Sequence, residues 1–198
     1  MNMTGGGFAA VAYGQNSGNS NSAQLEIMNG CVLDASTTKG VAINGGTVWL
    51  IGNSDLVSTA QIATIKGTYT MTDGVISFLT PTLTANGTIA WGYFKVIGDV
   101  IWSGGQYNPG LNCRAGDPAN ISNRWIIIGT LTVDATMASK PTIGPVPQFL
   151  PAGQQASGTW DVIQATKVVG GTPRIIQGWT LLPVVNADGV TTGFRVNK

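Results

Sequence analysis

The feature that most constrains this chain is a Gly-Thr pair that recurs along it, each time followed by alternating apolar residues. If the threonine is counted as the first position, the second and fourth positions are apolar in every case, as Leu131 and Val133 are after Thr130. Alternation with a period of two indicates a β-strand that buries one face. The pairs are Gly46-Thr47, Gly67-Thr68, Gly87-Thr88, Gly129-Thr130 and Gly158-Thr159.

The spacing of these pairs predicts how the strands are arranged. The first three pairs follow one another at intervals of about 21 residues, and a second series of glycines (30, 52, 74 and 98) runs out of phase with them. Two strand starts in each interval predict a single-stranded parallel β-helix (β-solenoid) with coils of ~21 residues, stacked ~4.8 Å apart. The alternative is a β-sandwich or jelly roll, whose turns also recur at short intervals.

Composition supports an all-β chain and excludes several classes of function. Of 198 residues, 28 are glycine and only one, Glu26, is glutamate, so helix formers are scarce and turns are many. The absence of histidine removes His-based catalysis and His-containing metal sites. A net charge of +1 offers no field for nucleic acid, and no apolar run reaches the ~18 residues that a membrane span needs. We therefore expect no enzyme, no catalytic residue, no cofactor, no metal, no nucleic-acid partner and no membrane insertion.

Three regions can be distinguished along the chain. Residues 1–22 form an arm rich in Gly, Asn and Ser with a short apolar stretch, residues 23–140 are expected to be solenoid coils, and residues 141–198, which begin with several prolines, are expected to form a C-terminal cap. Residues 104–123 are expected to leave the coils as an excursion loop. The apolar stretch of the arm either packs on the chain's own end coil or is donated to the next copy. In the second case the self-association residues are Phe8, Val11 and Tyr13.

Aspartates and cysteines give two further expectations. Asp55, Asp73 and Asp99 each lie close to a corner glycine and could stack into an acidic row, although Asp beside Gly is also ordinary turn chemistry. Cys31 and Cys113 are separated by nearly four of the expected coils, or ~19 Å along the stack, which exceeds the reach of a disulfide. They are therefore expected to stay unpaired with each other.

Six tryptophans in so small a chain make the best case for ligand binding, because sugars stack on exposed aromatic faces. Trp49 falls on the opposite phase from Val48 and Leu50, and we expect Trp49 and Trp102 to be exposed and to contact glycans. The simpler explanation is that aromatic side chains fill a core or cover the end of a solenoid.

The second half of the chain resembles a known family. It holds residues 125–133 (WIIIGTLTV), 149–153 (FLPAG) and 158–165 (GTWDVIQA). Over residues 105–198 this pattern is similar to the final coils and C-terminal cap of large secreted bacterial β-helix proteins of the autotransporter-passenger type. That family has a G-T-L-T-V strand, an apolar segment with Pro and Gly, a G-T-x-x-V-I-x-A strand and a closing glycine-rich hairpin. The resemblance implies an extracellular β-helix used for adhesion, surface coating or assembly, and export by the chain's own C-terminus is not implied.

The sequence therefore predicts a secreted or cell-surface structural protein without catalytic activity. A solenoid exposes unpaired backbone groups at its ends, and such edges need a cap or recruit another copy. End-to-end association into a fibre or surface layer is the leading expectation, with the chain itself as partner. The alternative is a β-helix that binds or degrades carbohydrate, with a surface polysaccharide as partner.

Overall fold

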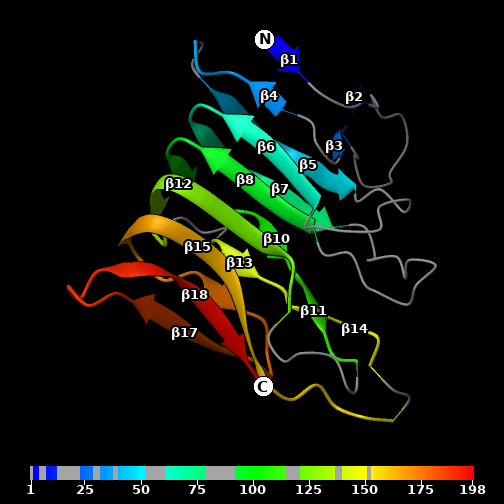
Figure 1. Ribbon diagram of the computed structural model, residues 1–198, viewed down its shortest axis with the longest axis vertical. Coiled ribbons are helices and arrows are strands. Elements are labelled where there is room, and N and C mark those ends of the chain that lie inside the picture. The colour runs from blue at the N-terminus through cyan, green and yellow to red at the C-terminus, as the bar shows by residue number, and fades with distance from the viewer. Residues whose placement is uncertain are drawn as a thin grey trace.

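A computed structural model describes residues 2–4, 8–12, 23–28, 32–37, 40–51, 61–78, 92–114, 121–136, 140–150 and 153–198. Within these residues the structure is all-β, with strands and turns and no helix. Most strands belong to one large sheet in which neighbours in space are distant in sequence. The strands stack from the N-terminal end to the C-terminal end, and the two termini lie at opposite ends of the stack (Figure 1).

The described strands have the following bounds: β1 Asn2–Thr4, β2 Phe8–Ala12, β3 Ala23–Met28, β4 Val32–Asp34, β5 Val41–Ile51, β6 Gln61–Lys66, β7 Tyr69–Phe78, β8 Gly92–Ile97, β9 Val100–Trp102, β10 Gln106–Asn108, β11 Gly110–Asn112, β12 Arg124–Val133, β13 Thr142–Ile143, β14 Val146–Gln148, β15 Thr159–Gly170, β16 Arg174–Ile175, β17 Thr180–Val185 and β18 Thr191–Asn197.

The parallel strands form three walls that the chain visits in turn. Wall 1 consists of β4, β6, β8 and the first parts of β12 and β15. Wall 2 consists of the first parts of β5 and β7, then β9 and the second parts of β12 and β15. Wall 3 consists of the second parts of β5 and β7, then β10, β13 and β16. The pairing within these walls is parallel, which is compatible with a β-solenoid, whereas a β-sandwich pairs its strands antiparallel.

The register shows how long each winding is. In wall 1, Gln61 pairs with Gly92 and Tyr93 with Arg124, so the chain returns to the same place after 31 residues. Wall 2 keeps the same offset, because Tyr69 pairs with Val100. The predicted winding of about 21 residues is therefore wrong for these strands. The Gly-Thr pairs misled because they occur at different places in the winding, some at a corner and others inside or at the start of a strand.

The corner between walls 1 and 2 is a column of glycines. Gly67, Gly98 and Gly129 stack on one another at 31-residue steps, and a Cβ on Gly98 or Gly129 would collide with the backbone carbonyl of the glycine before it. Gly67 and Gly98 also have positive φ angles of 110° and 148°, which favour glycine. Their N–H groups donate to Ile97 and Ile128 of the next winding at 2.9 and 3.1 Å. Glycine is therefore required here both by conformation and by close approach of the backbone.

The core lies inside the walls and follows the predicted alternation. After Thr68, Thr130 and Thr159 the second and fourth positions are buried, which confirms the alternation at those three pairs. Aromatic rings from successive windings touch: Trp125 lies 5.8 Å from Phe94 and 5.4 Å from Trp102 between ring centroids. Along the stack the inward positions form four columns: Ala63–Phe94–Trp125, Ile65–Val96–Ile127, Tyr69–Val100–Leu131 and Met71–Trp102–Val133.

Antiparallel strands lie at both ends of the stack. At the N-terminal end β1 pairs with β4, and β2 pairs with β3, which continues wall 3 by pairing parallel to β5. At the C-terminal end β18 runs antiparallel to β15, and β17 closes a hairpin with β18. The turn of this hairpin includes Gly189, which has a positive φ of 77°.

Two segments expected to be irregular contain strands of the stack. Within residues 104–123, predicted as an excursion loop, β10 joins wall 3 and β11 pairs parallel to β14. Within residues 141–198, predicted as a cap, β13, β16 and the first part of β15 continue walls 3 and 1. Glycine, asparagine and proline made these segments read as loops, yet Tyr107, Leu111 and Ile143 are fully buried and anchor them to the core. Short strands between corners tolerate such residues because each strand needs only one or two inward apolar positions.

Candidate functional site

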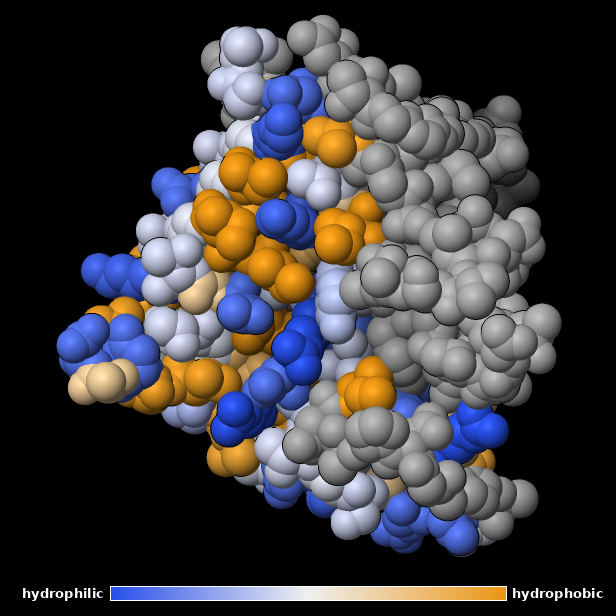
Figure 2. All heavy atoms as spheres, viewed as in Figure 1, coloured by the Kyte–Doolittle hydropathy of each residue, from blue (hydrophilic) through white to orange (hydrophobic). Residues whose placement is uncertain are grey.

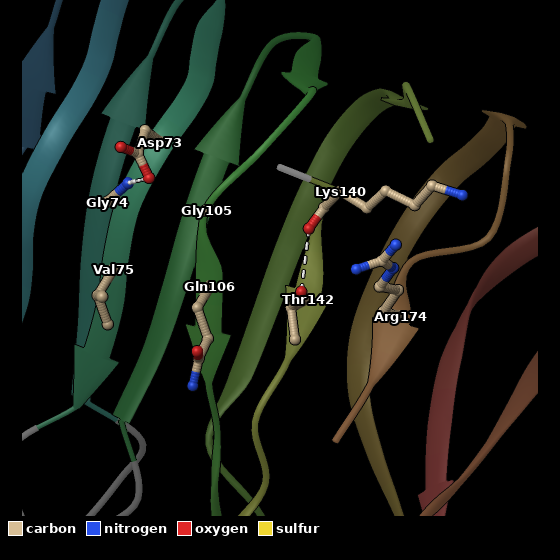
Figure 3. Close-up of a pocket in the computed structure, with 8 residues that line it drawn as sticks. All are labelled: Asp73, Gly74, Val75, Gly105, Gln106, Lys140, Thr142 and Arg174. Carbon is tan, nitrogen blue, oxygen red and sulfur yellow. Dashed lines mark hydrogen bonds between the residues drawn. The ribbon is translucent and has the colours of Figure 1, made fainter. Parts of the chain in front are cut away.

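An open groove of about 360 Å³ runs across the start of wall 3 (Figure 3). Four strands contribute to it, because β7, β10, β13 and β16 lie side by side in this wall. Its floor and sides carry the side chains of Asp73, Val75, Gln106, Lys140, Thr142 and Arg174.

The pairing register explains why these residues meet. Val75 pairs with Gln106, Gln106 with Thr142, and Thr142 with Arg174, so one residue from each strand occupies the same position in the wall. Stacked strands are ~4.8 Å apart, which makes this row ~14 Å long from the first strand to the fourth. The row runs across the strands, so a linear molecule lying in it would contact all four.

Glycines at the corner before wall 3 keep the groove shallow and open. Gly74 and Gly105 line it and have positive φ angles of 96° and 81°. A Cβ on Gly105 would lie 2.7 Å from the carbonyl oxygen of Gly74, so no side chain fits between the windings here. Asp73 stands at the N-terminal side of the groove, where its carboxylate accepts the Gly74 N–H at 2.7 Å.

The middle of the groove offers uncharged polar groups. The Gln106 side-chain amide donates to Asn108 Oδ1 at 2.6 Å, so these two side chains lie along β10 on the same face. Thr142 Oγ donates to the Lys140 carbonyl at 3.0 Å. The absence of a side chain at Gly144 leaves room for the hydrogen-bonded Gln106 and Asn108 side chains, which a Cβ at that position would overlap. Amide and hydroxyl groups both donate and accept, which suits a ligand rich in hydroxyls.

The C-terminal side of the groove carries two cations. The Arg174 backbone N–H donates to the Pro141 carbonyl at 2.8 Å, which fixes Arg174 beside the segment that carries Lys140. Figure 3 shows both side chains on this side, away from Asp73. The ion pairs of the described residues are Lys66–Asp34 and Arg195–Asp161, and neither involves Lys140 or Arg174. The groove therefore presents an electropositive end, a neutral middle and an acidic end.

Of the two predicted glycan-contacting tryptophans, Trp102 is contradicted by the structure. Its side chain is 0% exposed and packs against Trp125 in the core. In β9 it shares the inward phase with Val100, while Ile101 between them points outward and is 41% exposed. The large ring fills the interior of the solenoid, which is the usual role of a buried aromatic side chain.

The other predicted residues are placed only by their backbone or not at all. Trp49 lies in β5, where it pairs with Glu26 and Ser77, and its side chain lies outside the description. Phe8 and Val11 lie in β2, which pairs with β3 of the same chain. The apolar stretch of the arm therefore pairs with its own chain, the first of the two alternatives that the sequence left open. Tyr13 lies outside the described residues.

The aspartate and cysteine expectations have partial outcomes. Asp73 and Asp99 lie at different corners of the winding and form no row, while Asp55 lies outside the described residues. Asp73 accepts the N–H of the adjacent Gly74, the local bond that turn chemistry predicts, whereas Asp99 accepts the Thr130 N–H of the next winding at 2.8 Å. Cys113 is a free, half-buried thiol, and burial raises its pKa. Cys31 lies outside the described residues.

Wall 1 exposes several apolar side chains: Ile97 and Ile128 pair with each other at one end of the wall, and Ile62 lies at the other end beside Tyr93. Figure 2 shows hydrophobic and hydrophilic side chains interspersed over β6, β8 and β12. Among the described residues, no group of three or more His, Cys, Asp or Glu side chains is placed to hold a metal ion. The same residues contain no helix that is long and apolar enough to cross a membrane.

Sequence reasoning found Asp73 but missed Gln106, Thr142, Lys140 and Arg174 as members of one site. These residues come together only through the pairing register of the windings. The numbers of residues that separate successive members of the row, from Val75 to Arg174, are unequal, so no regular spacing in the sequence reveals the row. No family model matches the chain, and no curated protein and no solved structure matches it either.

Proposed function

We propose that the chain is a non-catalytic, extracellular β-solenoid that self-associates end to end into a fibre or surface layer. Support comes first from the stacked parallel walls, in which β6, β8 and β12 repeat every 31 residues, since each winding buries its apolar face against its neighbours. Support also comes from a surface whose polarity is mostly uncharged, with 10 basic and 9 acidic residues in 198. The groove on wall 3 is lined, among the described residues, by groups suited to binding: amide, hydroxyl, ammonium, guanidinium and carboxylate side chains.

The observation that carries the proposal is the C-terminal end of the stack. β17 pairs with β18 on one side, and β16 pairs with β13 on one side, and neither has a second strand partner among the described residues. Apolar side chains are exposed at the same end: Ile176, Leu182 and Val185. Open strand edges that carry exposed apolar side chains favour pairing with another chain. Pro183 withholds one N–H from β17, so an added strand would pair with this edge in short segments.

The N-terminal end supplies the complementary surface in this proposal. β2, which contains Phe8 and Val11, pairs with β3 on one side, and the described strands offer nothing to its other side. Contact between the C-terminal end of one copy and the N-terminal end of the next is heterologous, and such contacts produce open filaments when the rotation does not close a ring.

Electron microscopy and sedimentation velocity of the purified chain test this proposal. We expect filaments whose amount rises with protein concentration. The double variant Leu182→Lys/Val185→Lys should remain monomeric, because charged side chains at a sheet edge oppose strand pairing. Ile128→Lys is the control, since Ile128 is as exposed as Val185 (51%) and lies on wall 1 in β12, which is paired on both sides by β8 and β15. Monodisperse wild-type monomers at every concentration, or equal assembly by both variants, would contradict the proposal.

A second candidate function is carbohydrate binding, and the groove on wall 3 favours it. The groove lies on a side wall, and of its described lining residues Arg174 alone belongs to an open edge strand, β16. Because Trp102 is buried, Trp49 is the one predicted glycan-contacting tryptophan that remains. Support for carbohydrate binding therefore comes from the row of polar side chains in the groove rather than from stacking of sugars on aromatic rings. Calcium-dependent cleavage of an acidic polysaccharide belongs to the same alternative and would be lost in Asp73→Ala.

A further inference from the structure

We propose that the groove on wall 3 binds a linear polysaccharide in which an acidic sugar is flanked by neutral sugars. Lys140 and Arg174 would hold the carboxylate, and Gln106 and Thr142 would contact the hydroxyls of the neutral units. The inference rests on the carbohydrate-binding alternative and makes its ligand specific. The groove residues lie outside β2 and β17, but Arg174 belongs to β16, whose open edge is part of the proposed association surface, so binding is measured at a protein concentration at which sedimentation velocity shows monomers.

The two cations carry the first step of the argument. Lys140 is half-buried and Arg174 is exposed, and the backbone hydrogen bond from Arg174 to Pro141 holds their segments side by side. Among the described residues that line the groove, Asp73 alone is acidic; it belongs to β7, while Arg174 belongs to β16 at the other end of the row. Two neighbouring positive charges with no carboxylate partner among the described side chains favour an anion between them. An arginine fork binds a carboxylate with two hydrogen bonds, and a lysine adds a point charge.

The row between the charges determines the shape of the ligand. Gln106 and Thr142 are half-buried at equivalent register positions, and Asn108 and Ser77 form a second polar row two residues further along the strands. These side chains present donors and acceptors at the regular spacing of the strands, ~4.8 Å. A polyhydroxylated chain lying across the strands can use each of them in turn. A compact apolar ligand would have one apolar side chain to contact among the described lining residues, Val75, and would remain exposed to solvent in this open groove.

The acidic end determines the charge pattern of the ligand. Asp73 would repel a second carboxylate, so a chain that is acidic at every unit fits less well than one that alternates acidic and neutral units. Nucleic acid, which is charged at every unit, is disfavoured for the same reason and by the net charge of +1. The order of cations, neutral row and carboxylate therefore selects an alternating acidic polysaccharide.

Isothermal titration of the full chain tests the inference with three oligosaccharides of equal length. The first alternates glucuronate with N-acetylglucosamine, the second is glucuronate throughout, and the third is N-acetylglucosamine throughout. We expect the alternating chain to bind at least about tenfold more tightly than the other two, the difference that one charge-assisted interaction supplies. Asp73→Asn should reduce the difference in affinity between the alternating and the fully acidic oligosaccharides, because it removes the carboxylate that repels a second acidic sugar.

Variants locate the site. Lys140→Gln/Arg174→Gln should weaken binding of the alternating chain about tenfold or more. Lys95→Gln/Lys167→Gln is the control, because it removes the same two charges from walls 1 and 2. An equal loss in the control would overturn the assignment of the groove. Equal binding of the neutral chain would overturn the acidic ligand while leaving carbohydrate binding intact, and no binding of any oligosaccharide would overturn both.

Discussion

Two regions of the interior are stabilised in different ways. We call the region around the glycine corner between walls 1 and 2 the regular half, and the region around β10, β11 and the start of β15 the irregular half. Around the glycine corner between walls 1 and 2, backbone ladders and stacked apolar side chains provide the contacts. Among the described residues, four buried side-chain polar atoms have no partner: Tyr69 Oη, Trp102 Nε1 and Trp125 Nε1 in this region, and Arg124 Nε at the start of β12. Around β11 and the start of β15, buried side chains hydrogen-bond to the backbone instead. Tyr107 donates to the Val162 carbonyl at 3.1 Å, and Trp160 donates to the Asn112 carbonyl at 3.1 Å.

The difference follows from the regularity of the windings. Where successive windings have equal length, every backbone group meets its counterpart one winding later, and side-chain polar groups are not needed to satisfy the backbone. Where the chain departs from that length, carbonyl and N–H groups lose their ladder partners, and asparagine, serine, tyrosine and tryptophan side chains take their place. Buried polar side chains therefore mark the points at which the regular stack is interrupted.

The largest effect is expected from Gly98→Ala, which tests the regular half. The added methyl group would collide with the backbone carbonyl of Gly67, and the positive φ of 148° adds conformational strain. We expect the free energy of unfolding to fall by more than about 3 kcal/mol, measured by urea denaturation. Gly189→Ala is the control, because its φ of 77° is also positive but nothing lies within 4 Å of the new Cβ. Equal losses would mean that strain alone, without close backbone approach, explains the glycine column.

A somewhat smaller loss is expected from Asn123→Ala, which tests the irregular half. Asn123 is 2% exposed, accepts the Gly110 N–H and donates to the Gly92 carbonyl, each at 3.1 Å. Removing it leaves a buried donor and a buried acceptor unpartnered, at a cost of about 2–3 kcal/mol in urea denaturation. Asn108→Ala serves as the control, because among the described residues its half-buried side chain accepts a hydrogen bond from Gln106 alone. A loss below that of Asn108→Ala would contradict the role assigned to the buried side chains.

The smallest effect comes from comparing Tyr107→Phe with Tyr69→Phe, one in each half. Both rings are fully buried, and burial raises the pKa of both hydroxyls, so both stay neutral. Tyr107→Phe should cost about 1 kcal/mol because it breaks a buried hydrogen bond, whereas Tyr69→Phe should leave stability unchanged or raise it. Thermal unfolding followed by circular dichroism measures the difference. A Tyr69→Phe loss as large as that of Tyr107→Phe would show that the two halves do not differ in this way.

The sequence predicted the strands and their inward faces better than it predicted how they stack. Alternation after Thr68 and Thr130 correctly placed Tyr69, Met71, Leu131 and Val133 in the core, because alternation is a local property. The winding length depends on which glycines share a corner. Gly67 and Gly129 belong to Gly-Thr pairs, but Gly98 between them is followed by Asp99, so the true column was divided between two apparent series.

The groove was harder to predict than the fold for a related reason. Gln106 and Thr142 become neighbours only once the register of wall 3 is known, and no local motif announces it. Trp102 shows the opposite limitation. Its exposure could not be judged from residue type, because large aromatic side chains serve equally well as core and as ligand contacts, and only the inward phase it shares with Val100 decides the matter.

Unequal winding lengths give the surface a freedom that the interior lacks. In wall 2, Val100 pairs with Leu131 after the usual 31 residues, whereas in wall 3 Gln106 pairs with Thr142 after 36. The additional residues lie between Val133 and Thr142, and the stretch they enlarge includes Lys140. Insertions in the segments that connect two walls can thus add polar or charged side chains to the surface of the solenoid while the packing of the core is unchanged. Recognition and stability can then evolve on separate parts of the same winding.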